Sequence, residues 1–138
     1  MFRFGEPHRA VIEVPLGSFV KRELHAGAEV DFVSPVPCPF NYGHVTGTLG
    51  VDGDPVDAVI LGPRIPLGAE LECPLVAVVR FLDAGEQDHK LVLSDAPLTE
   101  AQRLLLKGFF TVYAQARSGL NVAKKRWGRT AYLGLEEG

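Results

Sequence analysis

Residues 70–82, ELECPLVAVVRFL, form a long apolar run in which β-branched side chains are frequent. A run of this kind is typical of a buried strand. The acidic residues 83–88 that follow predict a loop, and residues 90–93 predict a returning strand. This stretch therefore indicates a strand–loop–strand unit.

The chain before this unit predicts further short strands separated by turns. The expected strands are residues 10–14, 18–24, 28–33, 44–51 and 57–61. Turn signals lie at His25-Ala26-Gly27 and at Asp52-Gly53-Asp54-Pro55, and three prolines within 34–39 indicate an extended connection. The first two-thirds of the chain is therefore expected to be β-structure.

A helical pattern begins after Pro97. Thr99 and Gln102 fit a capping box, and we predict one amphipathic helix over residues 100–117, with Gly119 as its stop. Its apolar residues at helical spacing are Leu105, Phe109, Val112 and Ala116. A last strand is expected at 130–133. Many short strands followed by one helix predict a small closed barrel with a helix packed against it.

The composition is that of a globular protein with one core. The chain has 138 residues, 46% hydrophobic and 22% charged, and we expect a single domain over 1–138. A net charge of -3 gives no reason to expect nucleic acid or an anionic membrane as a partner. No apolar run approaches the roughly 20 residues of a membrane helix, and residues 1–7 lack the core of a secretory signal. We therefore expect a cytoplasmic protein, in which Cys38 and Cys73 are free thiols.

Three carboxylates lie within six residues, at Asp52, Asp54 and Asp57. Asp-Gly and Asp-Pro are good turn formers, and this explanation alone suffices for Asp52. Three like charges on one turn repel each other, however, and a hard cation such as magnesium relieves that repulsion. The motif therefore predicts either a turn or a metal site.

Other charged residues have two interpretations each. The loop 83–88, with Lys90 after it, is either a solvated hairpin tip or part of a site. Lys21 and Glu23 share one face of a predicted strand, which is usually an exposed face. Glu13 lies between apolar residues and either needs a partner or faces water.

The order of these pieces resembles the soluble, family I inorganic pyrophosphatases. The stretch Asp52-Gly53-Asp54-Pro55-Val56-Asp57 matches the signature of that family, and the resemblance runs from about residue 11 to 90 and resumes at the helix. The other matching segments are Ile12–Pro15, Lys21–Glu23, Phe40–Gly43, Asp83–Lys90, and Phe109 and Phe110 with Tyr113. The resemblance implies a mainly β fold with α: a small closed OB-like five-stranded barrel, with one long helix from the C-terminal half of the chain packed against it.

The resemblance also implies a reaction and a set of roles. The reaction is the magnesium-dependent hydrolysis of inorganic diphosphate to two phosphates by a metal-activated water. Asp54 is implied as the general base. The implied metal ligands are Asp52, Asp57, Asp83 and Asp88, with Glu13 and Glu23 further out. The implied phosphate ligands are Lys21, Tyr42, Lys90 and Tyr113.

Three positions depart from the family pattern. Phe32 stands in place of an arginine, Cys38 in place of a tyrosine and Ala114 in place of a lysine. Each lost phosphate contact is expected to cost about 1.5–3 kcal/mol. Arg117 lies four residues after Tyr113 and can compensate, or it can complement the helix dipole.

Two alternative functions follow from these features. One is a catalytically weakened protein of the same fold that binds metal and phosphate compounds. The other is an OB-type nucleic-acid module that uses residues 124–127, which the acidic cluster disfavours.

The family usually has an additional segment before the helix that contributes to subunit packing. Its absence here leaves the usual bacterial hexamer open to question, although a homo-oligomer is still expected.

Overall fold

The computed structural model describes residues 2–18, 20–23, 29–33, 37–47 and 55–138. Within strands β2 and β3 it describes the backbone alone. The elements are β1 (Pro7–Val14), β2 (Val20–Glu23), β3 (Glu29–Val33), β4 (Asn41–Val45), β5 (Asp57–Ile60), β6 (Glu70–Asp83), β7 (Glu86–Gln87), β8 (Lys90–Leu93), α1 (Glu100–Ala123) and β9 (Ala131–Glu137).

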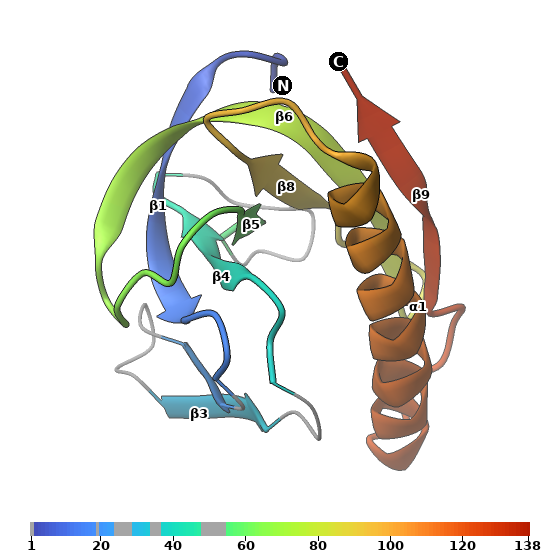
Figure 1. The fold of residues 1–138 in the computed structure, drawn as a ribbon. Coiled ribbons are helices and arrows are strands. Elements are labelled where there is room, and N and C mark those ends of the chain that lie inside the picture. Colours follow the sequence, from blue (N-terminus) through green and yellow to red (C-terminus); the bar gives the residue numbers. More distant parts are fainter. Residues whose placement is uncertain (1, 19, 24–28, 34–36, 48–54) are drawn as a thin grey trace.

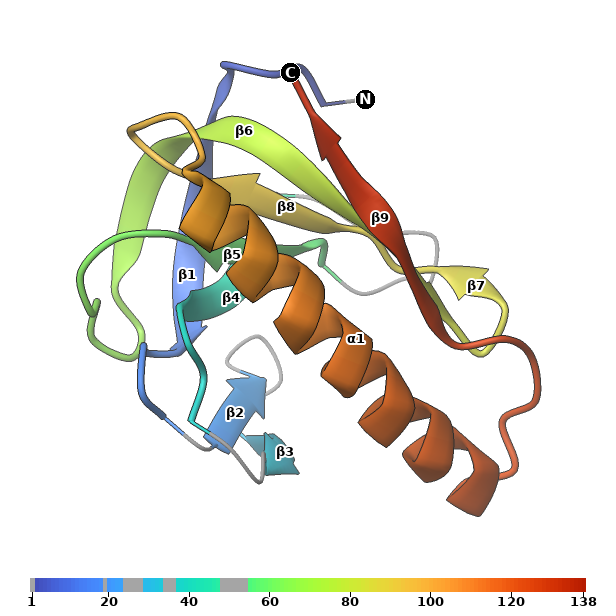
Figure 2. The same ribbon diagram turned by 45° about the vertical axis from the view of Figure 1, so that its right-hand side comes forward.

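Five strands pair in a closed ring, in the order β1–β4–β5–β8–β6 and back to β1. Strands β5 and β8 are parallel, and the other neighbours in the ring are antiparallel. Strands β7 and β9 extend the sheet from β6. Strands β2 and β3 form a separate pair, and β3 is seen below the strands of the ring in Figure 1. The helix α1 lies across the strands with β9 beside it (Figure 2). The predicted fold class, mainly β with one helix, is confirmed.

The long strand β6 joins the parts of this sheet. It pairs with β1, β7, β8 and β9 along different stretches of its length. Alternate side chains from Cys73 to Asp83 are buried, and most of those between them are half-buried. The apolar run therefore forms a strand whose two faces are covered to different degrees, which is the pattern of a ring with its helix on one side.

The helix begins where the sequence predicts and ends later. The capping box of Thr99 and Gln102 is present. The predicted end at residue 117 is wrong, because α1 continues through Gly119 to Ala123. Polar contacts made by Asn121, described below, hold this additional turn.

The buried face of α1 also differs from the prediction. Leu106, Phe110 and Ala114 are buried, whereas Leu105 and Val112 are exposed. Because Phe109 and Phe110 are both apolar, the apolar spacing in the sequence fits two helix faces, one centred on Phe109 and one on Phe110. Phe110 packs against both Phe40 and Phe81 and is fully buried, whereas Phe109, which also packs against Phe40, remains half-buried.

Several predicted strands have different bounds in the structure; the one expected at 130–133, for example, is β9 (Ala131–Glu137). The strand expected at 44–51 is β4, which begins at Asn41 and ends at Val45. Asn41 is fully buried and holds the chain on both sides: its Oδ1 accepts from the backbone N–H of Leu16 and of Ile65. Gly43 allows β1 and β4 to approach closely, because a Cβ there would overlap the backbone of Val11.

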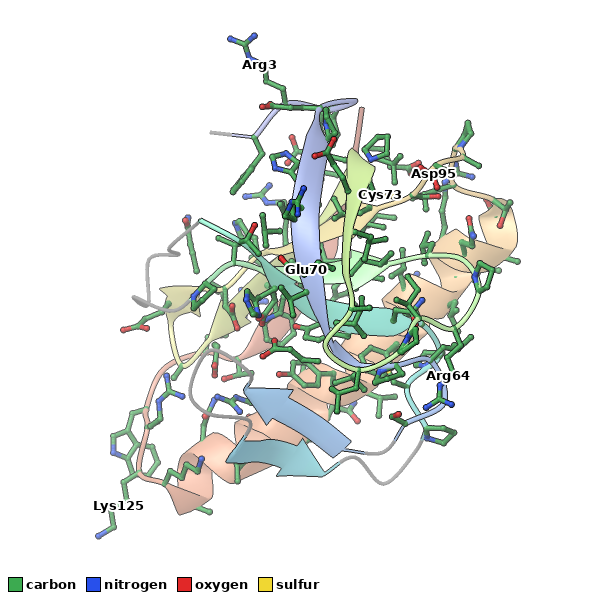
Figure 3. The ribbon with its side chains drawn as sticks, turned by 90° about the vertical axis from the view of Figure 1, so that its left-hand side faces the viewer. Arg3, Arg64, Glu70, Cys73, Asp95 and Lys125 are labelled. Carbon is green, nitrogen blue, oxygen red and sulfur yellow. The ribbon has the colours of Figure 1, made fainter. Side chains whose placement is uncertain are left out.

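The buried residues form two clusters. Cys38 belongs to the cluster under α1 and Cys73 to the other, and both are free thiols, as expected. Cys73 faces Asp95 (Figure 3), with 3.7 Å between Sγ and Oδ1. Burial raises the pKa of each thiol to about 11. Within the described residues, no helix has both the length and the apolar character needed to cross a membrane.

Candidate active site

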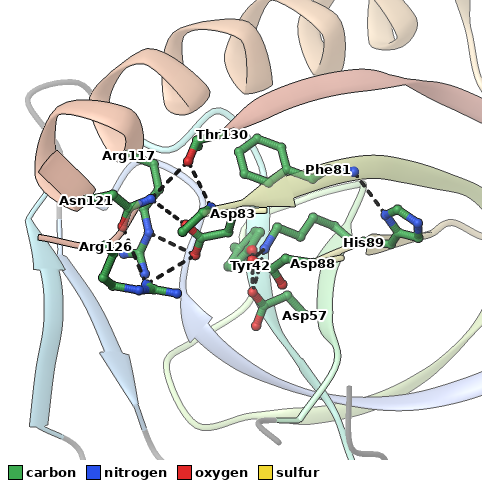
Figure 4. A network of polar contacts seen from close by, with 12 residues as sticks. Tyr42, Asp57, Phe81, Asp83, Asp88, His89, Arg117, Asn121, Arg126 and Thr130 are labelled. Atoms are coloured by element: carbon green, nitrogen blue, oxygen red, sulfur yellow. Dashed lines mark hydrogen bonds and ion pairs between the residues drawn. The ribbon is translucent and has the colours of Figure 1, made fainter. Parts of the chain in front are cut away.

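A buried lysine joins two carboxylates at the starts of β5 and β8. The side chain of Lys90 is fully buried, and its Nζ lies 3.0 Å from Oδ2 of Asp57 and 2.7 Å from Oδ2 of Asp88. Asp57 and Asp88 lie close together in Figure 4. Because β5 and β8 are parallel neighbours, strand pairing brings their first residues to the same edge. The fold therefore assembles a charged cluster in which Lys90 meets Asp57, 33 positions earlier in the sequence, and Asp88, two positions earlier.

Lys90 remains charged in this cluster. Burial by itself lowers the pKa of Lys90, but the electrostatic interactions with Asp57, Tyr113 and Asp88 outweigh this effect, so the pKa lies above its ordinary value. The ring of Phe81 lies below the ammonium, with its centroid 5.5 Å from Nζ. The cluster is therefore one ammonium group between two carboxylates, packed on an aromatic ring.

Tyr42 on β4 completes the cluster. Its hydroxyl donates a hydrogen bond to Oδ2 of Asp57 at 2.9 Å. Burial, and then the negative charge of Asp57, raise the pKa of Tyr42 well above its ordinary value, so the hydroxyl keeps its proton. Tyr113 on α1 stacks on Phe109. It also contributes to the raised pKa of Tyr42 and to that of Lys90.

Asp83, at the end of β6, has a different set of partners (Figure 4). Its Oδ2 lies 3.2 Å from Nε of Arg117 and 3.7 Å from Nη1 of Arg126. Its Oδ1 accepts a hydrogen bond of 2.6 Å from Nδ2 of Asn121, which also donates to Oγ1 of Thr130 at 3.0 Å. This carboxylate is 7% exposed, so the hairpin 83–88 is no solvated tip at this end.

The turn after Asp83 is fixed to the segment that follows α1. The backbone N–H of Ala84 donates to Oγ1 of Thr130, and that of Gly85 donates to the carbonyl of Arg129. Gly128 packs so closely on Ala84 that a Cβ there would overlap its carbonyl. His89 holds the other end of the hairpin, because its Nδ1 accepts from the backbone N–H of Phe81 at 3.0 Å. Burial, and then the charge of Arg80, lower the pKa of His89.

Glu13 lies in a β-bulge of β1 and is fully buried. The register between β1 and β4 shifts between Ile12 and Val14, which turns the Glu13 side chain inward. Its Oε1 lies 3.3 Å from Nδ1 of His44 on the neighbouring strand. The interpretation of Glu13 as a half-exposed residue is therefore wrong, and the expectation of a partner is met.

The structure brings together only part of the predicted site. Asp57, Asp88, Lys90 and Tyr42 form one cluster, with Tyr113 nearby, while Asp83 and Glu13 have partners of their own. Asp52 and Asp54 lie outside the described residues. Lys21 and Glu23 lie on β2, of which only the backbone is described.

Sequence reasoning missed Asn121, Thr130 and His89. It named Arg126 only as part of a basic stretch that either compensates for the lost phosphate contacts or forms a solvated tail, and the structure places Arg126 beside Asp83. A signal for Asn121 was present, because it lies four residues after Arg117 and would share its face in a helix that continued past Gly119.

The residues present fit a hard divalent cation in part. Oxygen ligands are available in Asp57 and Asp88, which converge on the same nitrogen. Among the described residues no group of three acids, histidines or cysteines is close enough to hold a metal ion. The described part of the chain thus supplies two converging carboxylates for such a cation.

Taken together, a closed ring of five strands, one covering helix and an acidic cluster around a buried lysine define a β-protein of OB-like type. A family model described as inorganic pyrophosphatase matches residues 10–133. The chain belongs to the inorganic pyrophosphatase family.

Individual relatives agree with this assignment. The inorganic pyrophosphatases of Aquifex pyrophilus and Streptomyces coelicolor are each 33% identical, with 85% and 86% of this chain and 77% and 85% of those proteins covered. The soluble inorganic pyrophosphatase 2 of Chlamydomonas reinhardtii is 43% identical over 89 residues, which are 59% of this chain and 46% of that protein. The chain thus spans about half the length of that relative.

Solved structures give the same result. The inorganic pyrophosphatase of Helicobacter pylori has a TM-score of 0.75 at 27% identity, with 99% of this chain and 89% of that chain covered. The inorganic pyrophosphatase of Neisseria gonorrhoeae has a TM-score of 0.72 at 26% identity, with coverage of 96% and 83%.

Proposed function

We propose that this protein hydrolyses inorganic diphosphate to two phosphates with the help of Mg²⁺. The observation that carries the proposal is the buried ammonium of Lys90 between the carboxylates of Asp57 and Asp88, in a chain that belongs to the inorganic pyrophosphatase family. When bound, Mg²⁺ would lower the pKa of a water molecule and neutralise the charge of diphosphate.

The chain's own residues would divide the remaining work. Asp52, Asp57, Asp83 and Asp88 would hold the cations, with Glu13 and Glu23 further out. Asp54 would accept the proton of the attacking water. Lys21, Tyr42, Lys90 and Tyr113 would bind phosphate oxygens and stabilise the charge that develops on them. Tyr42 suits this role, because its raised pKa keeps the hydroxyl a donor.

Two of the three positions that depart from the family pattern serve the core. Cys38 and Ala114 are both buried in the cluster under α1. Neither can supply a charge to the substrate, so binding of diphosphate depends on the remaining cations.

Phosphate release from diphosphate tests the proposal. We expect the wild-type protein to release phosphate with Mg²⁺ and to stop when EDTA removes the metal. No release under either condition, together with tight Mg²⁺-dependent binding of diphosphate, would instead identify the catalytically weakened alternative. Binding to single-stranded DNA without metal would favour the nucleic-acid alternative.

We also propose that the protein is a cytoplasmic homo-oligomer that uses the outer face of α1. After Lys107, every exposed position of this helix through Ala123 is uncharged, and all of them are described. Leu104, Val112 and Val122 are 61%, 58% and 57% exposed. A surface helix normally carries charges on its outer face, so an uncharged face indicates a contact with another chain. Both free thiols suit the reducing cytoplasm.

Replacing both Leu104 and Val112 by glutamate is expected to convert the oligomer to monomer, because four charges would meet in each two-fold contact. Sedimentation velocity measures the change. The control is Leu67→Glu, at an apolar residue that is 48% exposed outside the helix. A wild-type protein that sediments as a monomer would contradict the proposal.

A further inference from the structure

The two oxygens of Asp83 have partners of different kinds. Oδ1 accepts from Asn121, an amide that is 2% exposed and is held in turn by Thr130. Oδ2 faces two cations, Arg117 and Arg126, whose side chains are 18% and 40% exposed. The amide contact is short and buried, so it fixes the direction of the carboxylate. The cationic contacts are longer and partly open to water, so they can exchange.

The negative charge of Asp83 is thus paired with two arginine side chains of the same chain. A carboxylate between two guanidinium groups gains less from a divalent cation than a carboxylate without them, because the arginines must first be displaced. A guanidinium that leaves Asp83 is in turn suited to bind phosphate oxygens with its planar set of donors.

We propose that Arg117, assisted by Arg126, pairs with Oδ2 of Asp83 in the free protein and leaves this carboxylate for the phosphate oxygens of the substrate when a divalent cation binds to Asp83. Asn121 is the positioning residue that keeps Asp83 aimed during the exchange. Binding of a divalent cation at Asp83 and binding of diphosphate at Arg117 then favour each other, because each relieves the same ion pair. This inference rests on the proposed function.

The exchange predicts opposite effects of one substitution on two ligands. Arg117→Gln is expected to tighten the weakest Mn²⁺ site by about threefold to tenfold, because Asp83 loses a competitor. The same variant is expected to weaken binding of imidodiphosphate, a non-hydrolysable analogue, by about tenfold in saturating Mg²⁺. Titration calorimetry with Mn²⁺ alone and with imidodiphosphate measures both effects without turnover.

Three further variants complete the test. Arg117→Lys keeps the charge and should leave Mn²⁺ binding near that of wild type. Arg103→Gln removes a more exposed arginine of the same helix, which pairs with Glu137, and should change neither titration. Asn121→Ala should weaken the same Mn²⁺ site, because Asp83 loses its fixed direction.

The outcomes separate this inference from the proposed function. Unchanged or weaker Mn²⁺ binding in Arg117→Gln overturns the claim that arginine competes for Asp83. Tighter Mn²⁺ binding with unchanged imidodiphosphate binding overturns the exchange. A wild-type protein that binds no Mn²⁺ overturns both the inference and the proposed function.

Discussion

Replacing Lys90 by methionine is expected to destabilise the metal-free protein by about 3–5 kcal/mol. The substitution keeps most of the side-chain volume but removes the cation that Asp57 and Asp88 share. Both carboxylates would then face each other with side chains that are only 18% and 20% exposed. Two like charges in such a place destabilise the folded state, since the unfolded chain solvates them fully.

Urea unfolding in EDTA and in Mg²⁺ measures this effect. We expect Mg²⁺ to restore more stability to Lys90→Met than to the wild type, because a divalent cation can replace the lost ammonium. Lys107→Met, at an exposed position of α1, is the matched control and should change stability little. A loss below about 1 kcal/mol in EDTA would show that the ammonium does not hold the two carboxylates together.

Replacing Asp54 by asparagine is expected to lower kcat for diphosphate by on the order of a hundredfold to ten thousandfold. Asparagine has nearly the same shape but cannot accept the proton of the attacking water. Since the predicted metal ligands remain, Mg²⁺-dependent binding of diphosphate should be largely kept. The large effect is therefore expected in kcat rather than in the affinity for substrate.

Phosphate release over a range of diphosphate concentrations separates kcat from KM. Asp95→Asn serves as the control, since Asp95 is exposed and contacts only the thiol of Cys73 among its described side-chain partners. Full activity in Asp54→Asn would reject the role of Asp54 as general base. It would leave the family assignment intact, because that assignment rests on residues 10–133 as a whole.

Local signals in the sequence predicted local structure well. The capping box at Thr99 depends on residues three positions apart, so it is visible in any short window. The end of α1 is not, because Asn121 holds the last turn through Asp83, 38 residues earlier in the chain. A glycine at 119 is a stop signal only where no such tertiary contact opposes it.

The candidate site likewise depends on tertiary contacts that no local stretch of sequence indicates. Nothing near Asp57 in sequence indicates that Lys90 lies beside it, because the parallel pairing of β5 and β8 brings them together. The family resemblance supplied both residues in advance. It did not supply the partners of Asp83, since Arg117, Asn121 and Arg126 become neighbours only after α1 and β9 have packed.

The most direct test of the account is a crystal structure of the protein with Mg²⁺ and imidodiphosphate. We expect Mg²⁺ at about 2.1 Å from carboxylate oxygens of Asp57 and Asp88, with a phosphate oxygen on Lys90. A structure in which Lys90 alone still occupies these carboxylates, while metal and analogue bind elsewhere, would contradict the central claim.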